Sequence, residues 1–394
     1  GYAELVCLDV SAPSDWPWWR GPYRNGISLE TDWEPAALSN KSNVVWQSNV
    51  GNGHSAVAIS GARLYTMGNR NNRDIVVCLD VATGTQLWRV SYSCPAGDYP
   101  GPRSTPVVDD MRVYTLSRDG QAYCLDALTG NVLWHTNLTT AFGAQAPTWG
   151  MASSAVVFGP YVLYNAGSHG IMLDKRTGVS IWSSPAGIGN YNTPVLHVGT
   201  KTMTAFFFNK SSLCCVDVAT GKLLWSFPWE TRYDIMAADP LPIGDAVFIS
   251  SAYDKGAALV AAKNSKPKTV WQNKNMCNHF STCVLIDGHL YGISGNTGNG
   301  ALVCLDPTTG AKKWRQPGGF EALTAAGDKL ICVTLKGEAV VVRATPTAYM
   351  EAARCAVLPL PRRDTKCWTM PVLNRGRIFF RNSVGDLLCV DVSK

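Results

Sequence analysis

Short apolar runs that end in turn residues are the main pattern along this chain. Residues 77–79 (VCL) form one such run, and Asp80, Thr83, Gly84 and Trp88 follow it. A β-branched apolar run favours a strand, an Asp can close a turn by accepting backbone N–H bonds, and Gly supplies the positive φ that ends the turn. Side chains alternate along a strand, so the Trp occupies a fixed face of the outgoing strand. The pattern therefore predicts a β-hairpin.

The frame Asp-x-x-Thr-Gly-x-x-x-Trp occurs five times with constant internal spacing. Its glycines are Gly84, Gly130, Gly178, Gly221 and Gly310, which lie 46, 48, 43 and 89 residues apart. The last interval is about two periods, and the skipped unit keeps Trp271 but has lost its turn. A period of 40 to 45 residues without a 3.6-residue apolar repeat is typical of four-stranded propeller blades. The sequence thus predicts an all-β propeller of four-stranded antiparallel blades.

Two separate counts predict eight blades over residues 43–394. The first strands of the blades begin near Ser55, Ser104, Ser153, Asn192, Ala238, Ser281, Leu323 and Thr369. The outgoing strands carry Trp46, Trp88, Trp134, Trp182, Trp225, Trp271 and Trp314, with a degenerate copy near residues 352–357. Residues 44–46 lack an incoming strand, and residues 385–393 lack an outgoing one. We therefore expect these two segments to pair and to close the ring, which removes the free sheet edges.

Residues 1–42 are expected to form an N-terminal region outside the single propeller domain of residues 43–394. Residues 13–42 are rich in Pro, Trp and Gly and predict an irregular strap across one end of the ring. Residues 1–12 contain a strand-like run, which is interpreted as a loosely packed arm. The alternatives are a spare strand, an expression remnant or a strand donated to a neighbouring molecule, which would make the protein self-assembling.

Composition and charge narrow the function classes. The net charge of +6 is spread without a long basic run, which disfavours a nucleic-acid partner. No stretch approaches 18 apolar residues, so no membrane-spanning segment is predicted. These residues hold no secretory signal either, although a mature chain would have lost it. The sequons at Asn40, Asn137 and Asn209 are attributed to chance.

The 13 cysteines do not predict a disulfide framework. Five of them occupy one repeated position two residues before an Asp: Cys78, Cys124, Cys215, Cys304 and Cys389. Equivalent positions in different blades are too far apart to pair, so small buried thiols are expected there. Among the remaining cysteines, Cys277–Cys283 and Cys355–Cys367 are candidate bridges.

The repeat resembles the tryptophan-docking repeat of pyrroloquinoline-quinone (PQQ) type β-propellers, and the resemblance covers nearly the whole chain. It implies that the seven repeated tryptophans pack between adjacent blades. Segments such as residues 15–22, 99–106 and 273–281 resemble PQQ-like propellers of exported bacterial type. The superfamily includes quinoprotein alcohol dehydrogenases, which hold PQQ and calcium beside an adjacent-cysteine disulfide. It also includes the BamB-like branch, which has no cofactor and acts through protein contacts.

The sequence contains few of the features that PQQ-dependent dehydrogenase chemistry requires. Cys214 and Cys215 are adjacent, but they lie in a predicted strand, where neighbouring side chains face opposite sides. No cluster of oxygen ligands for calcium is readable, so PQQ and calcium are unsupported and no metal site is predicted. No nucleophile–base pair is readable either, and no catalytic residue is predicted; His279 is the histidine to test first.

The residues just before each first strand are expected to ring one mouth of the axial channel. They form an aromatic and hydrogen-bonding set that is typical of a ligand pocket. They are His54, Arg103, Trp149, Tyr191, Asn192, Asp234, His279, Phe320, Lys366 and Trp368. The alternative is that these residues only fill the channel and cap turns.

The leading hypothesis is a non-catalytic, exported scaffold, periplasmic or on the cell surface, that binds a protein, peptide or glycan at this mouth. A PQQ-dependent oxidoreductase and a self-assembling surface protein built through residues 1–12 are the two alternatives.

Overall fold

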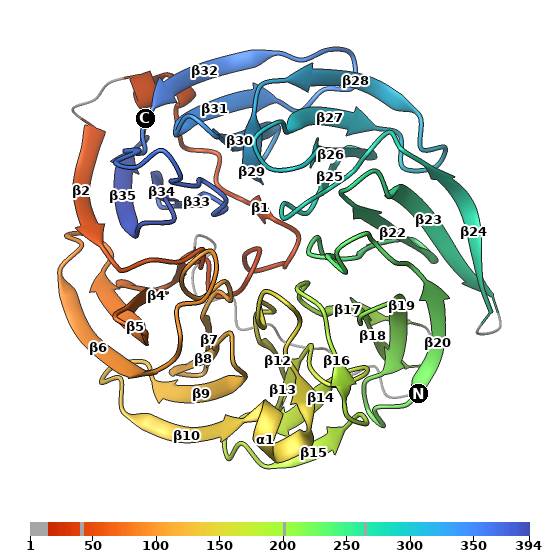
Figure 1. The fold of residues 1–394 in the computed structure, drawn as a ribbon. Helices are drawn as coiled ribbons and strands as arrows, with labels where there is room; N and C mark the ends of the chain where they lie inside the picture. Colours follow the sequence, from red (N-terminus) through yellow and green to blue (C-terminus); the bar gives the residue numbers. More distant parts are fainter. Residues whose placement is uncertain (1–14, 40–42, 200–201, 264–265) are drawn as a thin grey trace.

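The protein is a ring of eight β-sheets around a central axis. The computed structural model describes residues 15–39, 43–199, 202–263 and 266–394 (Figure 1). Each blade contains four antiparallel strands, and in seven of the eight blades these strands pair in chain order. The prediction of an all-β, eight-bladed propeller is confirmed.

The first four blades follow one another along the chain. They comprise β3 (Ala58–Ser60), β4 (Arg63–Arg70), β5 (Arg73–Asp80) and β6 (Gln86–Ser93); β7 (Val107–Asp109), β8 (Arg112–Leu116), β9 (Gln121–Asp126) and β10 (Val132–Asn137); β12 (Val156–Phe158), β13 (Tyr161–Tyr164), β14 (Ile171–Asp174) and β15 (Ser180–Ser183); and β17 (Val195–Val198), β18 (Met203–Phe208), β19 (Ser212–Asp217) and β20 (Leu223–Pro228). Between blades, α1 (Leu138–Phe142) precedes β11 (Ala144–Gln145), which pairs with β16 (Gly187–Ile188).

Blades five to seven repeat the arrangement. They comprise β21 (Leu241–Ile243), β22 (Ala246–Ser251), β23 (Gly256–Lys263) and β24 (Lys266–Asn273); β25 (Val284–Ile286), β26 (His289–Ser294), β27 (Ala301–Leu305) and β28 (Lys312–Pro317); and β29 (Phe320–Ala326), β30 (Lys329–Thr334), β31 (Glu338–Arg343) and β32 (Glu351–Ala356). The seventh blade has a fifth strand, because β1 (Ile27–Ser28) pairs in parallel with β29.

The eighth blade joins strands from the two ends of the described chain. It contains β33 (Val372–Asn374), β34 (Arg377–Arg381), β35 (Asp386–Asp391) and β2 (Val44–Asn49). β2 pairs antiparallel with β35, with Trp46 opposite Cys389. In Figure 1 the red β2 lies beside the blue β35. The outer strand of this blade, β2, therefore comes before all the other blades in the sequence, whereas its other three strands come after them.

Each repeated Asp closes its turn with one carboxylate oxygen. Asp80 Oδ1 accepts the backbone N–H groups of Ala82 and Thr83, at 3.0 and 2.9 Å, and the Thr83 hydroxyl at 2.9 Å. Asp126 Oδ1 makes the equivalent three bonds in the second blade. These bonds explain why Asp and Thr keep a fixed spacing before the turn glycine.

Six of the seven repeated tryptophans contact the turn of the following blade. Trp134 Nε1 donates to the Lys175 carbonyl at 3.0 Å, and its ring lies against Gly178, where an added Cβ would come within 2.8 Å of the indole. Equivalent N–H bonds to the next blade are made by Trp46, Trp88, Trp182, Trp271 and Trp314. The turn glycine is therefore required twice, once for its φ of +72° and once for the space that the indole occupies.

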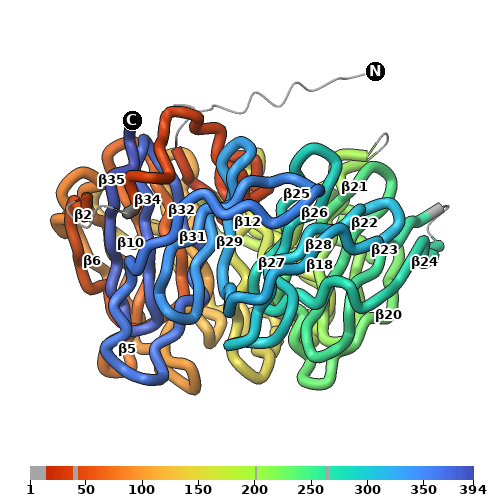
Figure 2. Tube along the Cα trace, turned by 90° about the horizontal axis from the view of Figure 1, so that it is seen from above, coloured from red at the N-terminus to blue at the C-terminus, as the bar shows by residue number. Residues whose placement is uncertain are grey.

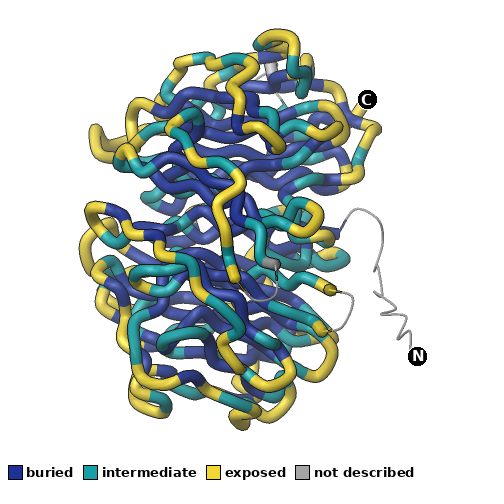
Figure 3. Tube along the Cα trace, turned by 90° about the vertical axis from the view of Figure 1, so that its right-hand side faces the viewer, coloured by how far each residue is buried: buried dark blue, intermediate teal, exposed yellow. Residues whose placement is uncertain are grey.

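The core is divided among the interfaces between blades. Eight clusters of buried apolar side chains, counted over the described residues, each join two adjacent blades. Figure 3 shows this pattern as buried strands inside and exposed turns outside. The five repeated cysteines lie in these clusters as free, buried thiols, as predicted. The candidate bridges Cys277–Cys283 and Cys355–Cys367 were wrong, because all four thiols are free.

The segment that precedes the ring crosses one of its faces (Figures 1 and 2). It contacts the first strands of two blades: Trp16 bridges to Ile59 of β3, and the Trp18 ring nitrogen donates to the Val108 carbonyl of β7 at 3.0 Å. A short 3-10 helix (Pro35–Ser39) ends the described part of this segment. No helix in the described part of the chain has the length and apolar character that crossing a bilayer requires.

Candidate functional site

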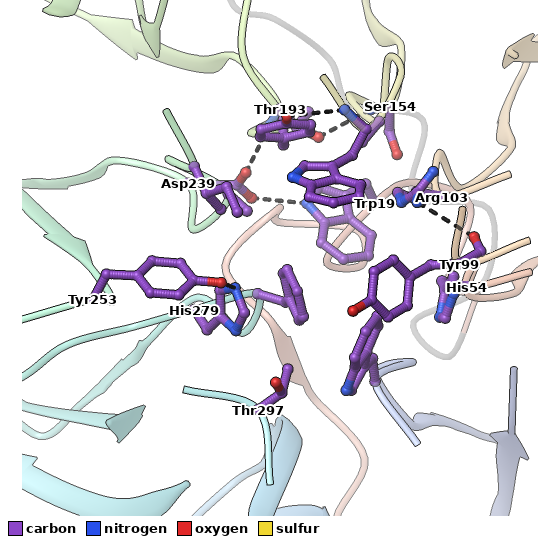
Figure 4. A pocket seen from close by; sticks show the side chains of 17 residues that line it. Trp19, His54, Tyr99, Arg103, Ser154, Thr193, Asp239, Tyr253, His279 and Thr297 are labelled. Carbon is purple, nitrogen blue, oxygen red and sulfur yellow. Dashed lines mark hydrogen bonds between the residues drawn. The ribbon is translucent and has the colours of Figure 1, made fainter. Parts of the chain in front are cut away.

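A pocket lies on the ring axis, and residues that precede the first strands of seven blades help to line it (Figure 4). Its cavity volume is about 180 Å³. Trp19 reaches it from the segment that crosses one face of the ring. The full lining is Trp19, His54, Tyr99, Arg103, Trp149, Ala152, Ser154, Tyr191, Thr193, Ile235, Ala237, Asp239, Tyr253, His279, Phe280, Thr297 and Trp368.

Trp368 is the centre of an aromatic wall. Its ring centroid lies 4.9 Å from His54, 5.4 Å from Tyr99 and 4.7 Å from Phe280. Tyr99 in turn meets Trp149 edge-on at 5.7 Å. Aromatic pairs at these separations stabilise one another beyond the area that they bury. The pocket therefore has a preformed apolar wall assembled from five separate loops.

Two histidines of the pocket are held neutral at pH 7. Burial lowers the pKa of His279 to about 4, and its Nε2 lies 3.0 Å from the Tyr253 hydroxyl. The pKa of His54 lies well below its ordinary value, because of burial first and then the nearby positive charges of Arg103, Arg381 and Lys366. As neutral imidazoles, both side chains can form hydrogen bonds and stack on neighbouring rings, but they bring no charge to the pocket.

A chain of hydrogen bonds links the first strands of neighbouring blades around the axis. The Thr105 amide donates to Ser154 Oγ at 2.9 Å, the Ser154 amide to Thr193 Oγ1 at 3.1 Å, and the Thr193 amide to Asp239 Oδ1 at 2.8 Å. The Asp239 amide then donates to Thr282 Oγ1 at 2.8 Å. Side-chain oxygens thus satisfy backbone donors where the strands begin, and they form one polar side of the pocket.

Asp239 is the carboxylate of the pocket lining, and it is already paired. Its Oδ2 accepts the Trp19 ring N–H at 2.8 Å and lies 4.0 Å from the Arg20 guanidinium. Burial raises the pKa of Asp239, while Arg20 acts in the opposite direction. Burial dominates for Arg20 as well and lowers its pKa. The pair anchors the crossing segment to the ring wall.

The structure brings six of the ten residues expected at the mouth into this one pocket. They are His54, Arg103, Trp149, Tyr191, His279 and Trp368.

The other four expected residues lie outside this lining. Asn192 is fully buried, and its Oδ1 accepts the Phe208 amide at 3.0 Å. Asp234 faces Lys210 at 4.0 Å, Phe320 belongs to the core and to a small neighbouring cavity, and the Lys366 ammonium lies 5.9 Å from the Trp368 ring centroid. Position before a first strand therefore does not decide which way a side chain turns.

Sequence reasoning did not name several lining residues, among them Trp19, Tyr99, Tyr253 and Phe280. Trp19 belongs to residues 13–42, which were expected to form an irregular strap across one end of the ring. Tyr99 lies in a long loop at a φ of +49°. Phe280 directly follows His279, and that adjacency was the one available signal for it.

The described residues do not fit calcium-dependent PQQ chemistry. Calcium takes six to eight oxygen ligands, whereas Asp239 is the one acidic side chain in the lining and is committed to Arg20 and Trp19. No group of three His, Cys, Asp or Glu side chains suited to a metal occurs among the described residues. Cys214 and Cys215 are free thiols whose side chains enter different interblade clusters, as expected from their strand.

Fold and repeat define an eight-bladed β-propeller of the PQQ-like repeat class. A family model described as outer membrane protein assembly factor BamB matches residues 36–273 and 209–347. The chain belongs to this family.

Three individual matches extend this result. The chain is 26% identical over 239 residues to the outer membrane protein assembly factor BamB of Burkholderia pseudomallei, covering 57% of this chain and 58% of that protein. It is 27% identical over 204 residues to a polyvinylalcohol dehydrogenase of a Pseudomonas species, covering 43% and 31%. The chain thus spans less than two thirds of either relative. The quinohemoprotein alcohol dehydrogenase of Comamonas testosteroni shares the fold with a TM-score of 0.71 at 12% identity, covering 98% of this chain and 82% of that one.

Proposed function

We propose that the protein is a non-catalytic, exported interaction scaffold that binds a protein, peptide or glycan at its axial pocket. The observation that carries the proposal is the preformed aromatic wall around Trp368, which faces a cavity and has polar side chains beside it. Aromatic residues with a few placed polar groups are typical of binding sites. Membership of a family described as an assembly factor supports a partner that is itself a protein, and export to the periplasm or cell surface.

The proposal also assigns a structural role to each of the two regions of the chain. Residues 43–394 would act as one rigid propeller domain that presents the pocket, with the repeated tryptophans as docking side chains between blades. The region of residues 1–42 would serve as its arm and strap. Self-association through residues 1–12 remains a proposal, because those residues lie outside the described part of the chain.

The test is a screen of peptide and glycan arrays with labelled protein. We expect defined binding signals for the wild type and their loss in the Trp368→Ala variant, because the central ring of the wall is removed. The Tyr23→Ala variant is the matched control, since Tyr23 is an exposed aromatic outside the pocket lining. The same signals for wild type and Trp368→Ala would refute binding at the axial pocket.

A PQQ-dependent oxidoreductase is the second candidate, and the similarity to polyvinylalcohol dehydrogenase favours it. The donor set of the pocket argues against it. Adding PQQ with calcium and an alcohol, and following dye reduction, separates the two candidates. Alcohol-dependent turnover would establish the second candidate, and its absence at saturating PQQ is expected for a scaffold.

A further inference from the structure

One side of the axial pocket presents hydrogen-bond donors that lack acceptors. Ser154 Oγ, Thr193 Oγ1 and Tyr191 Oη each accept a backbone N–H, at 2.9, 3.1 and 3.2 Å. Each hydroxyl therefore keeps its own proton, and no acceptor for these protons occurs among the described residues. All three side chains are more than nine-tenths buried. A buried donor without an acceptor is costly, so this side of the pocket favours a ligand rich in acceptor oxygens.

Arg103 adds a positive charge to the same lining. Its Nη2 donates to the backbone carbonyls of Asp98 and Tyr99, at 3.1 and 3.3 Å, and its Nη1 has no hydrogen-bond partner. No carboxylate among the described residues forms an ion pair with it. A largely buried guanidinium without an ion-pair partner is unfavourable, and a carboxylate can accept two of its N–H bonds at once.

Neighbouring charges strengthen the preference for an anion. The positive charge of Arg103, and those of Arg381 and Lys366 outside the lining, all disfavour protonation of His54, which is itself a lining residue. The negative charge of Asp239 is offset by Arg20 and by the Trp19 N–H. The free charge that a ligand meets is therefore positive.

The aromatic wall limits the shape of the ligand. Tyr99 is inclined at 75° to Trp149 and at 42° to Trp368, and Phe280 is inclined at 48° to Trp368. Because these ring faces are inclined to one another, the space between them is not flat. A fused planar ring system would require a flat space between two parallel rings. The cavity volume of about 180 Å³ also lies below the roughly 300–1,000 Å³ of pockets for drug-sized ligands. A single six-membered ring fits both observations.

We propose that the axial pocket recognises a carboxylate carried on a single six-membered ring. The carboxylate faces Arg103 and the hydroxyls of Tyr191 and Ser154, and the ring lies against Trp368 and Phe280. This inference rests on the proposed function, because it names the ligand chemistry of the same pocket. An aromatic acid and a sugar acid share this chemistry.

The test is calorimetric titration of the full chain at pH 7 with four probes: benzoate, glucuronate and their neutral counterparts benzamide and glucose. We expect saturable binding of at least one acid, about tenfold or more tighter than its neutral counterpart, because charged hydrogen bonds are the stronger ones. Preference for benzoate identifies an aromatic ring, and preference for glucuronate identifies a sugar ring.

Two variants test the assigned contacts. Arg103→Gln should weaken binding of the preferred acid about tenfold or more, and Tyr191→Phe should weaken it several-fold. Tyr161→Phe is the matched control and should leave the affinity unchanged, because Tyr161 lies outside the pocket lining. The Tyr191→Phe arm keeps the test decisive if Arg103→Gln fails to fold.

The possible failures are distinguishable. Equal binding of an acid and its neutral counterpart, or unchanged affinity in both pocket variants, overturns the carboxylate inference and leaves axial binding intact. No binding of any probe, together with array signals that still require Trp368, also overturns the carboxylate inference alone. Array signals that do not depend on Trp368 overturn the proposed function itself.

Discussion

Gly178 offers a direct test of why the repeat keeps a glycine at its turn. In the Gly178→Ala variant the new Cβ would meet Trp134 Cδ2 at 2.8 Å and would occupy a backbone with a φ of +72°. The positive φ costs an L-residue about 1–2 kcal/mol. Displacing a well-packed ring adds about 1–3 kcal/mol. We therefore expect the free energy of unfolding to fall by about 2–5 kcal/mol, the sum of the two effects.

The matched control is Gly159→Ala in the same blade. Gly159 has a φ of +49°, but an added Cβ there would meet no atom within 4 Å. This variant should lose only the backbone contribution, about 1–2 kcal/mol. Both substitutions stiffen the unfolded chain equally, so that effect cancels in the comparison.

The assay is urea unfolding followed by circular dichroism, with a double-mutant cycle on Trp134. Once Trp134→Ala has removed the indole, Gly178→Ala should cost no more than Gly159→Ala does, because the collision is gone. The reasoning is refuted if the two glycine variants are equally destabilised in the wild-type background. Absence of coupling between positions 178 and 134 would refute it as well.

Two further predictions concern titration and thiol reactivity. Burial raises the pKa of Asp74 from 3.8 to about 6, so the folded state binds this proton more tightly, and stability should fall by about 3 kcal/mol as the pH rises from 4 through 6. Asp74→Asn should remove that part of the slope when unfolding free energies are measured from pH 4 to 7, and parallel curves for the two proteins would contradict the assignment. Cys355 is the one described cysteine that is not buried, so in a Cys7→Ser background a thiol reagent should label about one cysteine in the native protein and all twelve after unfolding. Rapid labelling of several native thiols would show that the blade interfaces open.

The fold could be predicted from the sequence because most blades repeat the same turn and the same following strand, and both are determined by residues close together in the chain. Asp80 and Gly84 make a turn that depends only on near neighbours, and Trp88 marks the strand that follows. Even the blade that has lost the frame kept Trp271 in its outer strand, β24. The space that the indole takes beside each turn glycine was not predicted, because it involves the neighbouring blade.

The pocket was predictable only in part, because its residues come from segments without a repeat. Arg103 and Trp368 stand just before first strands, and the ring geometry brings such positions together. Asn192 stands at an equivalent position but turns into the wall to bond Phe208. Trp19 lies 220 positions before its partner Asp239, and nothing local in the sequence indicates that contact.

The shared eighth blade has a consequence for how the protein is made. Asn49 of β2 and Asp386 of β35 are 337 positions apart. At typical rates of synthesis, of 5–20 residues per second, β2 waits roughly 20 to 70 s for its partner to emerge from the ribosome. Throughout that time its pairing edge is open to other strands, so β2 exposes the nascent chain to aggregation until β35 has been made.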